Sequence, residues 1–223
     1  MAPIDIASNG EFDLLLERLA KDVVDLEIFR RLRADLDAAR AEFSTEFAQS
    51  RAFWSLTFQA LIEAVFFRLS RIYDGHDQSL SLLRWLETIQ HNLELIQTGE
   101  MDEVPFDLQQ LSIDIESVSD SDPVVKKLIQ LRGNCIAHVN AEAIAKGKGL
   151  EKRFGLSPDE VNLLVERAAT LLNRYGAILR RTVWSTQIVG HDDFRTVLIA
   201  MRSYCKKYET EIEEEFSRLT QAT

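Results

Sequence analysis

Apolar residues recur three or four positions apart along most of the chain, the spacing that places them on one face of an α-helix. The first such stretch begins after Ser8 or Asn9, either of which can cap a helix, and continues to about Leu36. A second stretch, from about 51 to 73, is apolar around much of its circumference, as expected for a central helix packed on several sides. No stretch alternates between apolar and polar residues over the length of a strand. The pattern therefore predicts an all-α, mainly antiparallel bundle of about six or seven helices.

The later helices have recognisable starts. A leucine-rich helix is expected from 79 to about 97, and a short amphipathic one from 107 to 118. Ser121 or Asp122 can cap the next helix, in which Pro123 suits the first position because no amide donor is needed there. Residues 157–160, Ser-Pro-Asp-Glu, predict another helix start with a capping residue, a proline and a glutamate at the third position.

Charge and cysteine content limit the kinds of partner. The formal net charge of the 223-residue chain is -10, which disfavours general attraction to nucleic acid, so any such contact must be local. Cys135 and Cys205 are isolated thiols, which predicts neither a disulfide framework nor a metal cluster and is typical of a reducing cytoplasm. The N-terminus has no secretory pattern, and no stretch has about 18 uninterrupted apolar residues. We expect a cytoplasmic protein without membrane contact.

Arg132 and His138 lie off the apolar face of the helix that begins at Pro123. Arginine offers a fixed fork of donors to a phosphate, and histidine titrates near neutral pH. In an ideal helix, six residues separate the two side chains by about 9 Å along the axis and about 120° around it. One phosphate is therefore hard to hold between them unless Arg132 reaches along the groove, the helix distorts near Gly133, or a second copy of the chain supplies the missing half.

Residues 132–138, Arg-Gly-Asn-Cys-Ile-Ala-His, resemble the Arg-x(4–6)-His motif of the HEPN superfamily. The upstream segments 60–63 and 69–74, followed by a leucine-rich helix, are similar to its abortive-infection, AbiU-type branch, so the resemblance covers about 45–140. It implies a single HEPN-like domain over 1–223, with an N-terminal helix in 1–44, the core in 45–140 and further helices in 141–223.

The resemblance also implies a function. In HEPN ribonucleases the histidine is the acid or base and the arginine binds the phosphate, roles that fall here on His138 and Arg132, with Asn134 as an orienting residue. The reaction needs no metal and no cofactor, and dimerisation across a two-fold axis brings two motifs together. The expected protein is a metal-independent, homodimeric endoribonuclease of phage defence or of a toxin-antitoxin system.

Two further groups are candidates for function. The local basic patch between 146 and 153 is either a solvated loop or a set of phosphate contacts to RNA; it comprises Lys146, Lys148, Lys152 and Arg153. Glu63 and Arg71 fall in polar seams of the apolar helix 51–73, where a carboxylate needs either a partner or a solvent groove. His76, in a turn between two aspartates, is better explained as an exposed turn residue than as a metal ligand, because no third ligand is spaced for it.

A non-catalytic function also fits the sequence. A helical interaction module, such as a protein partner or antitoxin in a defence system, is favoured by Gly133 in the motif and by the acidic composition.

Overall fold

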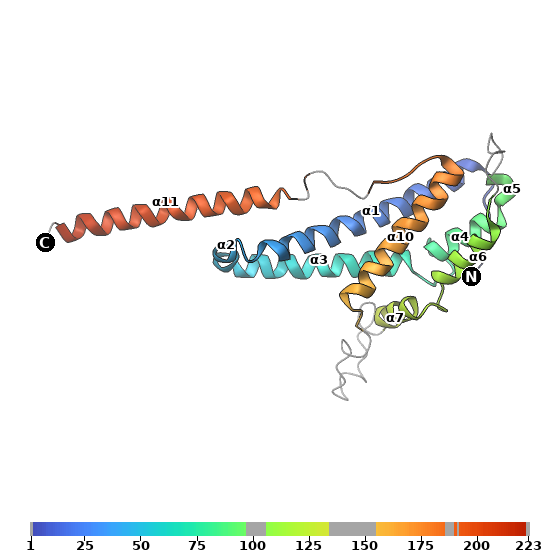
Figure 1. Cartoon of the computed structure of the whole chain (residues 1–223), viewed down its shortest axis with the longest axis horizontal. Coiled ribbons are helices and arrows are strands. Elements are labelled where there is room, and N and C mark those ends of the chain that lie inside the picture. Colours follow the sequence, from blue (N-terminus) through green and yellow to red (C-terminus); the bar gives the residue numbers. More distant parts are fainter. Residues whose placement is uncertain (1, 97–105, 134–154, 186–189, 191, 222–223) are drawn as a thin grey trace, which may run out of the picture. The chain divides into compact units, whose positions relative to one another are not determined.

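The computed structural model describes residues 2–96, 106–133, 155–185, 190 and 192–221, and all regular structure within these ranges is helical (Figure 1). The all-α prediction is confirmed. The helices in the described part of the chain are α1 (Asn9–Ala39), α2 (Ser44–Gln49), α3 (Arg51–Ile72), α4 (Leu82–His91), α5 (Leu93–Ile96), α6 (Leu108–Ser117), α7 (Pro123–Leu131), α10 (Pro158–Arg180) and α11 (Phe194–Gln221).

The predicted helix starts of α7 and α10 are confirmed. Oδ1 of Asp122 accepts from the amides of Val124 at 2.9 Å and Val125 at 3.0 Å, and Pro123 follows it. Ser157 and Glu160 form a reciprocal capping box at the start of α10. These contacts satisfy first-turn amides that have no partner within a helix.

The apolar pattern did not predict the short helices α2 and α5 as separate elements. The apolar periodicity weakens at residues 44–50, which indicates a bend or restart of the helix, and this region contains α2. The predicted helix 79–97 is divided into α4 and α5 at Asn92. The side chain of Asn92 donates to the carbonyl oxygens of Thr88 at 2.9 Å and Ile4 at 3.1 Å. An asparagine that bonds to nearby backbone in this way favours the end of a helix.

The contacts between residues group the chain into two compact units. Unit 1 comprises Met1–Glu27 and Ala64–Thr186, and unit 2 comprises Ile28–Glu63 and Gln187–Thr223. In unit 1, α4 packs against α6 and α7 against α10. The buried Trp85 stacks on Phe12 with ring centroids 6.1 Å apart and meets Tyr175 edge-on at 6.2 Å. The single-domain division expected from the sequence stays a prediction.

Unit 2 has a core of its own, in which α11 packs against α2. Its buried residues are Leu36, Ala39, Phe43, Trp54, Phe58, Leu61 and Leu198. Arg202 on α11 donates from Nε to the buried Glu46 of α2 at 2.6 Å and lies over the ring of Phe43. This hydrogen bond lowers the pKa of Glu46 in spite of the opposing effect of burial.

The prediction that α3 packs on several sides is wrong. Its buried residues recur every three or four positions from Trp54 to Ile72 and so lie on one face, whereas Phe53, Leu56 and Phe67 are more than half exposed. Apolar composition alone does not distinguish a buried face from an exposed one. Within the described ranges, α3 is also the one helix long and apolar enough to cross a membrane, a test of length and composition that the core helix of a soluble protein also passes.

Candidate functional site

Arg132 directly follows α7, where the backbone widens into a π-helical turn at Arg132 and Gly133. Such turns are frequent at functional sites. Nη1 of Arg132 donates to Oδ1 of Asp74, which lies just beyond the end of α3, 58 positions away in the sequence. The Arg132 side chain is 37% exposed, whereas Asp74 is buried. The arginine of the motif is thus anchored on its inner side and open to solvent on its outer side.

Asp74 is held by more than the ion pair. Its Oδ2 accepts from the hydroxyl of Ser79 at 2.8 Å, and Oδ1 also accepts from the backbone amide of His76 at 3.1 Å. Burial by itself raises the pKa of Asp74, but the hydrogen bonds from Arg132, Ser79 and the His76 amide together outweigh it and lower the pKa below its ordinary value. Asp74 is therefore an ionised, fixed acceptor for the guanidinium at neutral pH.

Helix α10 supports both ends of this ion pair. The buried hydroxyl of Tyr73, the residue before Asp74, donates to the carbonyl oxygen of Leu164 at 2.6 Å. The α7 side is attached through Lys127, whose Nζ lies 2.8 Å from Glu160.

Arg167 of α10 makes a second attachment to α7. It lies 3.1 Å from Asp122, the carboxylate that caps this helix. Because α10 contacts both segments, the separation between Asp74 and Arg132 is set by packing as well as by their own attraction.

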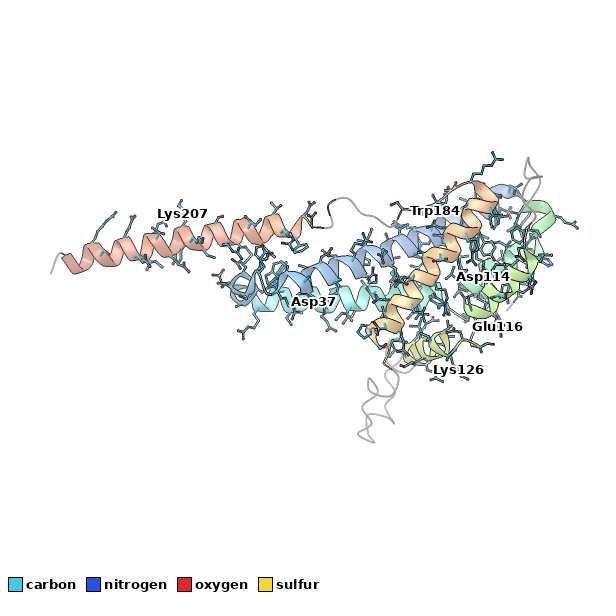
Figure 2. The ribbon with its side chains drawn as sticks, viewed as in Figure 1. Asp37, Asp114, Glu116, Lys126, Trp184 and Lys207 are labelled. Carbon is cyan, nitrogen blue, oxygen red and sulfur yellow. The ribbon has the colours of Figure 1, made fainter. Side chains whose placement is uncertain are left out.

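A second buried carboxylate provides a comparison within the same unit. Asp114 on α6, labelled in Figure 2, accepts from Nη1 of Arg174, from the hydroxyl of Tyr175 at 2.7 Å and from Gln110 at 3.0 Å. Its partners Arg174 and Tyr175 lie on α10. It resembles Asp74 in burial and in having an arginine partner, but its arginine is not part of the motif.

The two seam residues of α3 lie in different surroundings. Glu63 is exposed and accepts from Nε2 of Gln59 at 2.7 Å. Arg71 lies 3.0 Å from the buried Asp22, which also accepts from Arg68 at 2.5 Å. Neither seam residue has a contact with Arg132 among those described.

The other candidate residues lie outside the described residues, so their predicted roles are untested. They are His138 and Asn134 of the motif and Lys146, Lys148, Lys152 and Arg153 of the basic patch.

His76 has the contacts of a turn residue. Its side chain is exposed, and its Nδ1 accepts from the amide of Gln78 at 3.2 Å. Across the described ranges, no group of three or more histidine, cysteine or acidic side chains is arranged to hold a metal ion.

Asp74 is the site residue that sequence reasoning missed. It was assigned to a turn, and its partner is 58 positions away. The available signal was its position as the last residue of the 69–74 segment that carries the family resemblance.

The comparisons with known proteins identify a family. The HEPN AbiU2 family model, described as AbiU2, matches residues 10–198, a span that includes α3, Asp74 and α7. No curated protein and no solved structure matches the chain significantly. Because the family match covers most of its length, the chain belongs to the AbiU2 abortive-infection branch of the HEPN superfamily.

Proposed function

We propose that the protein is a metal-independent endoribonuclease in which Arg132 binds the scissile phosphate. The proposal rests on the Arg132 guanidinium, which is anchored through Nη1 to the buried Asp74. Its Nε and Nη2 have no hydrogen-bond partner among the described residues. An arginine that is fixed on one side and open on the other can present donors to a phosphate without first paying the entropy of ordering its side chain.

The proposed reaction is transfer at an RNA phosphodiester. The 2'-hydroxyl attacks the adjacent phosphorus, His138 acts as the acid or base, and the bond to the leaving 5'-oxygen breaks as that oxygen gains a proton. Arg132 stabilises the negative charge that develops on the phosphate oxygens. The products are a 2',3'-cyclic phosphate and a 5'-hydroxyl. Asn134 orients the reacting groups.

In an ideal helix, the offset between Arg132 and His138 makes it hard for both side chains to reach one phosphate. The π-helical turn at Arg132 and Gly133 supports a distorted helix as one way to bring both side chains to one phosphate. A wider turn changes the angle at which later side chains project. We also propose a homodimer with the motif helices near the two-fold axis, in which a second copy supplies the missing half of the site. Lys146, Lys148, Lys152 and Arg153 would then bind more distant phosphates of RNA, in the cytoplasm, during phage defence or as part of a toxin-antitoxin system.

The test is cleavage of mixed cellular RNA by the purified protein in EDTA. Wild type is expected to cleave, and His138→Ala and Arg132→Ala are expected to lose most of the activity, because a positioned acid or base typically contributes about 10² to 10⁴-fold. His76→Ala is the matched control, since it removes an exposed imidazole from the turn beside Asp74. Equal cleavage by wild type and His138→Ala would refute the assignment.

A non-catalytic interaction module is the second candidate, and Gly133 favours it because the residue after the arginine is usually polar in HEPN ribonucleases. A Cβ added to Gly133 meets no described atom within 4 Å, so a side chain can be introduced there. If wild type cleaves no RNA but Gly133→Asn does, Gly133 is the cause of the lost catalysis. If neither variant cleaves and both fold, the interaction module becomes the better assignment.

A further inference from the structure

Helix α11 presents an apolar surface along one side of its second half. Tyr204, Tyr208 and Ile212 recur at four-residue intervals, and their exposed fractions are 71%, 56% and 44%. The two tyrosine rings stack on each other, with centroids 6.5 Å apart and planes 7° apart. Three large side chains aligned in this way form a continuous ridge, which we call the tyrosine ridge, rather than scattered surface residues.

The first half of α11 is attached to unit 2, whereas the ridge continues beyond that attachment. Leu198 is fully buried in the core of unit 2, Arg202 pairs with Glu46, and Cys205 lies 2.8 Å from the side chain of Gln49. The ion pairs described further along are internal to α11: Lys207 with Glu211, and Glu214 with Arg218. The first half of α11 therefore fixes the second half in place, and the tyrosine ridge remains exposed for another contact.

The charges of α11 are divided between its two halves. Residues 194–207 contain four basic residues and no acidic one, whereas residues 208–221 contain five glutamates and one arginine. Lys207, labelled in Figure 2, is the last basic residue before the acidic half. A second α11 running parallel would place like charges together, but an antiparallel one would place each basic half along an acidic half.

We infer that two copies of the chain associate through antiparallel α11 helices, with Tyr208 at the two-fold axis. In this register Tyr204 of each copy lies opposite Ile212 of the other, and the basic half of each helix, which includes Lys207, runs along the acidic half of the other. Apolar and charge complementarity thus select the same alignment of the same helix. This surface is separate from the motif site and does not depend on the proposed ribonuclease activity.

The association is expected to be weak. Stable protein interfaces usually bury about 1,200 to 2,000 Å² in total, and a ridge of three side chains from each copy falls short of this. We therefore expect the association through α11, which is additional to the homodimer proposed at the motif helices, to depend on protein concentration in the micromolar range and to weaken as salt is added. Sedimentation of the full-length chain over a range of concentrations measures this association.

Charge reversal tests the antiparallel arrangement. An acidic variant carries Lys206→Glu and Lys207→Glu, and a basic variant carries Glu209→Lys, Glu213→Lys and Glu214→Lys. Each variant alone is expected to dimerise about tenfold or more weakly than wild type, and an equimolar mixture is expected to recover a heterodimer, because acidic and basic halves then meet again. Circular dichroism shows whether each variant keeps its helix content. Variants that dimerise like wild type, or a mixture of helical variants that recovers nothing, would overturn the inference.

Crosslinking tests the register. In a chain with Cys135→Ser and Cys205→Ser, Tyr208→Cys is expected to form an intermolecular disulfide, since the two copies of this residue face each other at the axis. Thr210→Cys is the control, because two residues along a helix place it about 200° away from Tyr208. Equal crosslinking at both positions, or a protein that is monomeric at every concentration, would overturn the inference. A dimer that survives α11 charge reversal and is lost on changing α7 would show that the copies associate through the motif helices alone, and it would also overturn the inference.

Discussion

Asp74→Asn is the sharpest single perturbation of the site because it removes a charge while keeping the shape of the side chain. Asn can still accept from Arg132 and from the His76 amide, but the ion pair with Arg132 is lost and both hydrogen bonds then go to a neutral acceptor. Hydrogen bonds to charged groups contribute about 1.5–3 kcal/mol each, and the 37% exposure of Arg132 reduces this value. We therefore expect the free energy of unfolding to fall by about 1–2 kcal/mol.

The effect on RNA cleavage is expected to be larger than this loss of stability suggests. If Asp74 fixes the guanidinium against the phosphate, its neutralisation lets Arg132 move, and a misplacement of about 1 Å can cost about 10²-fold in rate. The assay is single-turnover RNA cleavage in EDTA, at a temperature at which the variant remains folded. The rate constant for cleavage is expected to fall about 10- to 100-fold, with a smaller change in the RNA concentration needed for half-maximal rate.

Asp114→Asn is the matched control, since Asp114 is also buried and also accepts from an arginine of the same unit. It should lose a similar amount of stability and keep its cleavage rate. Two results would refute the reasoning. If Asp74→Asn cleaves at the wild-type rate while Arg132→Ala does not, another group positions Arg132. If Asp74→Asn cleaves faster, Asp74 restrains Arg132 from RNA rather than preparing it.

Three further predictions concern stability. Gly176→Ala should destabilise the protein by about 1–3 kcal/mol in denaturant unfolding, because the added Cβ would lie 2.6 Å from the ring of Trp184; an unchanged midpoint would contradict this packing. Gly133→Ala should instead raise stability by up to about 1 kcal/mol, since a Cβ there has room and alanine favours a helix; a loss would show that Gly133 needs a conformation closed to alanine. Because the pKa of Asp74 is lowered in the folded protein, its contribution is fully present above the unfolded-state pKa and is lost as the pH falls through the folded-state pKa. The stability difference between wild type and Asp74→Asn should therefore shrink on acidification, and a constant difference would argue against the ion pair.

Local signals predicted much of the fold. Asp122 and Pro123 marked the start of α7 because capping depends on residues within one turn of each other, and Ser157 marked the start of α10 in the same way. The weak periodicity of residues 44–50 indicated a bend or restart of the helix but not a separate α2, and the division at Asn92 was not predicted because the apolar spacing continues across it.

The site was predictable only in part, because its key contact is long-range. The motif identified Arg132, but no local pattern connects it to Asp74, because the two residues are brought together by tertiary packing in which α10 contacts the segments that carry both. The exposed apolar residues of α3 and α11 were missed for a related reason. Helical spacing shows which residues share a face, and it does not show whether another element covers that face.

The most direct test of the central claim is the chemistry of the RNA ends left after cleavage in EDTA. Transfer to the 2'-hydroxyl, aided by Arg132 and His138 without a metal, predicts a 2',3'-cyclic phosphate on one product and a 5'-hydroxyl on the other. A single 2'-deoxy substitution at the cleaved nucleotide should block the reaction. Products with a 5'-phosphate and a 3'-hydroxyl, or cleavage that needs a divalent ion, would contradict the account.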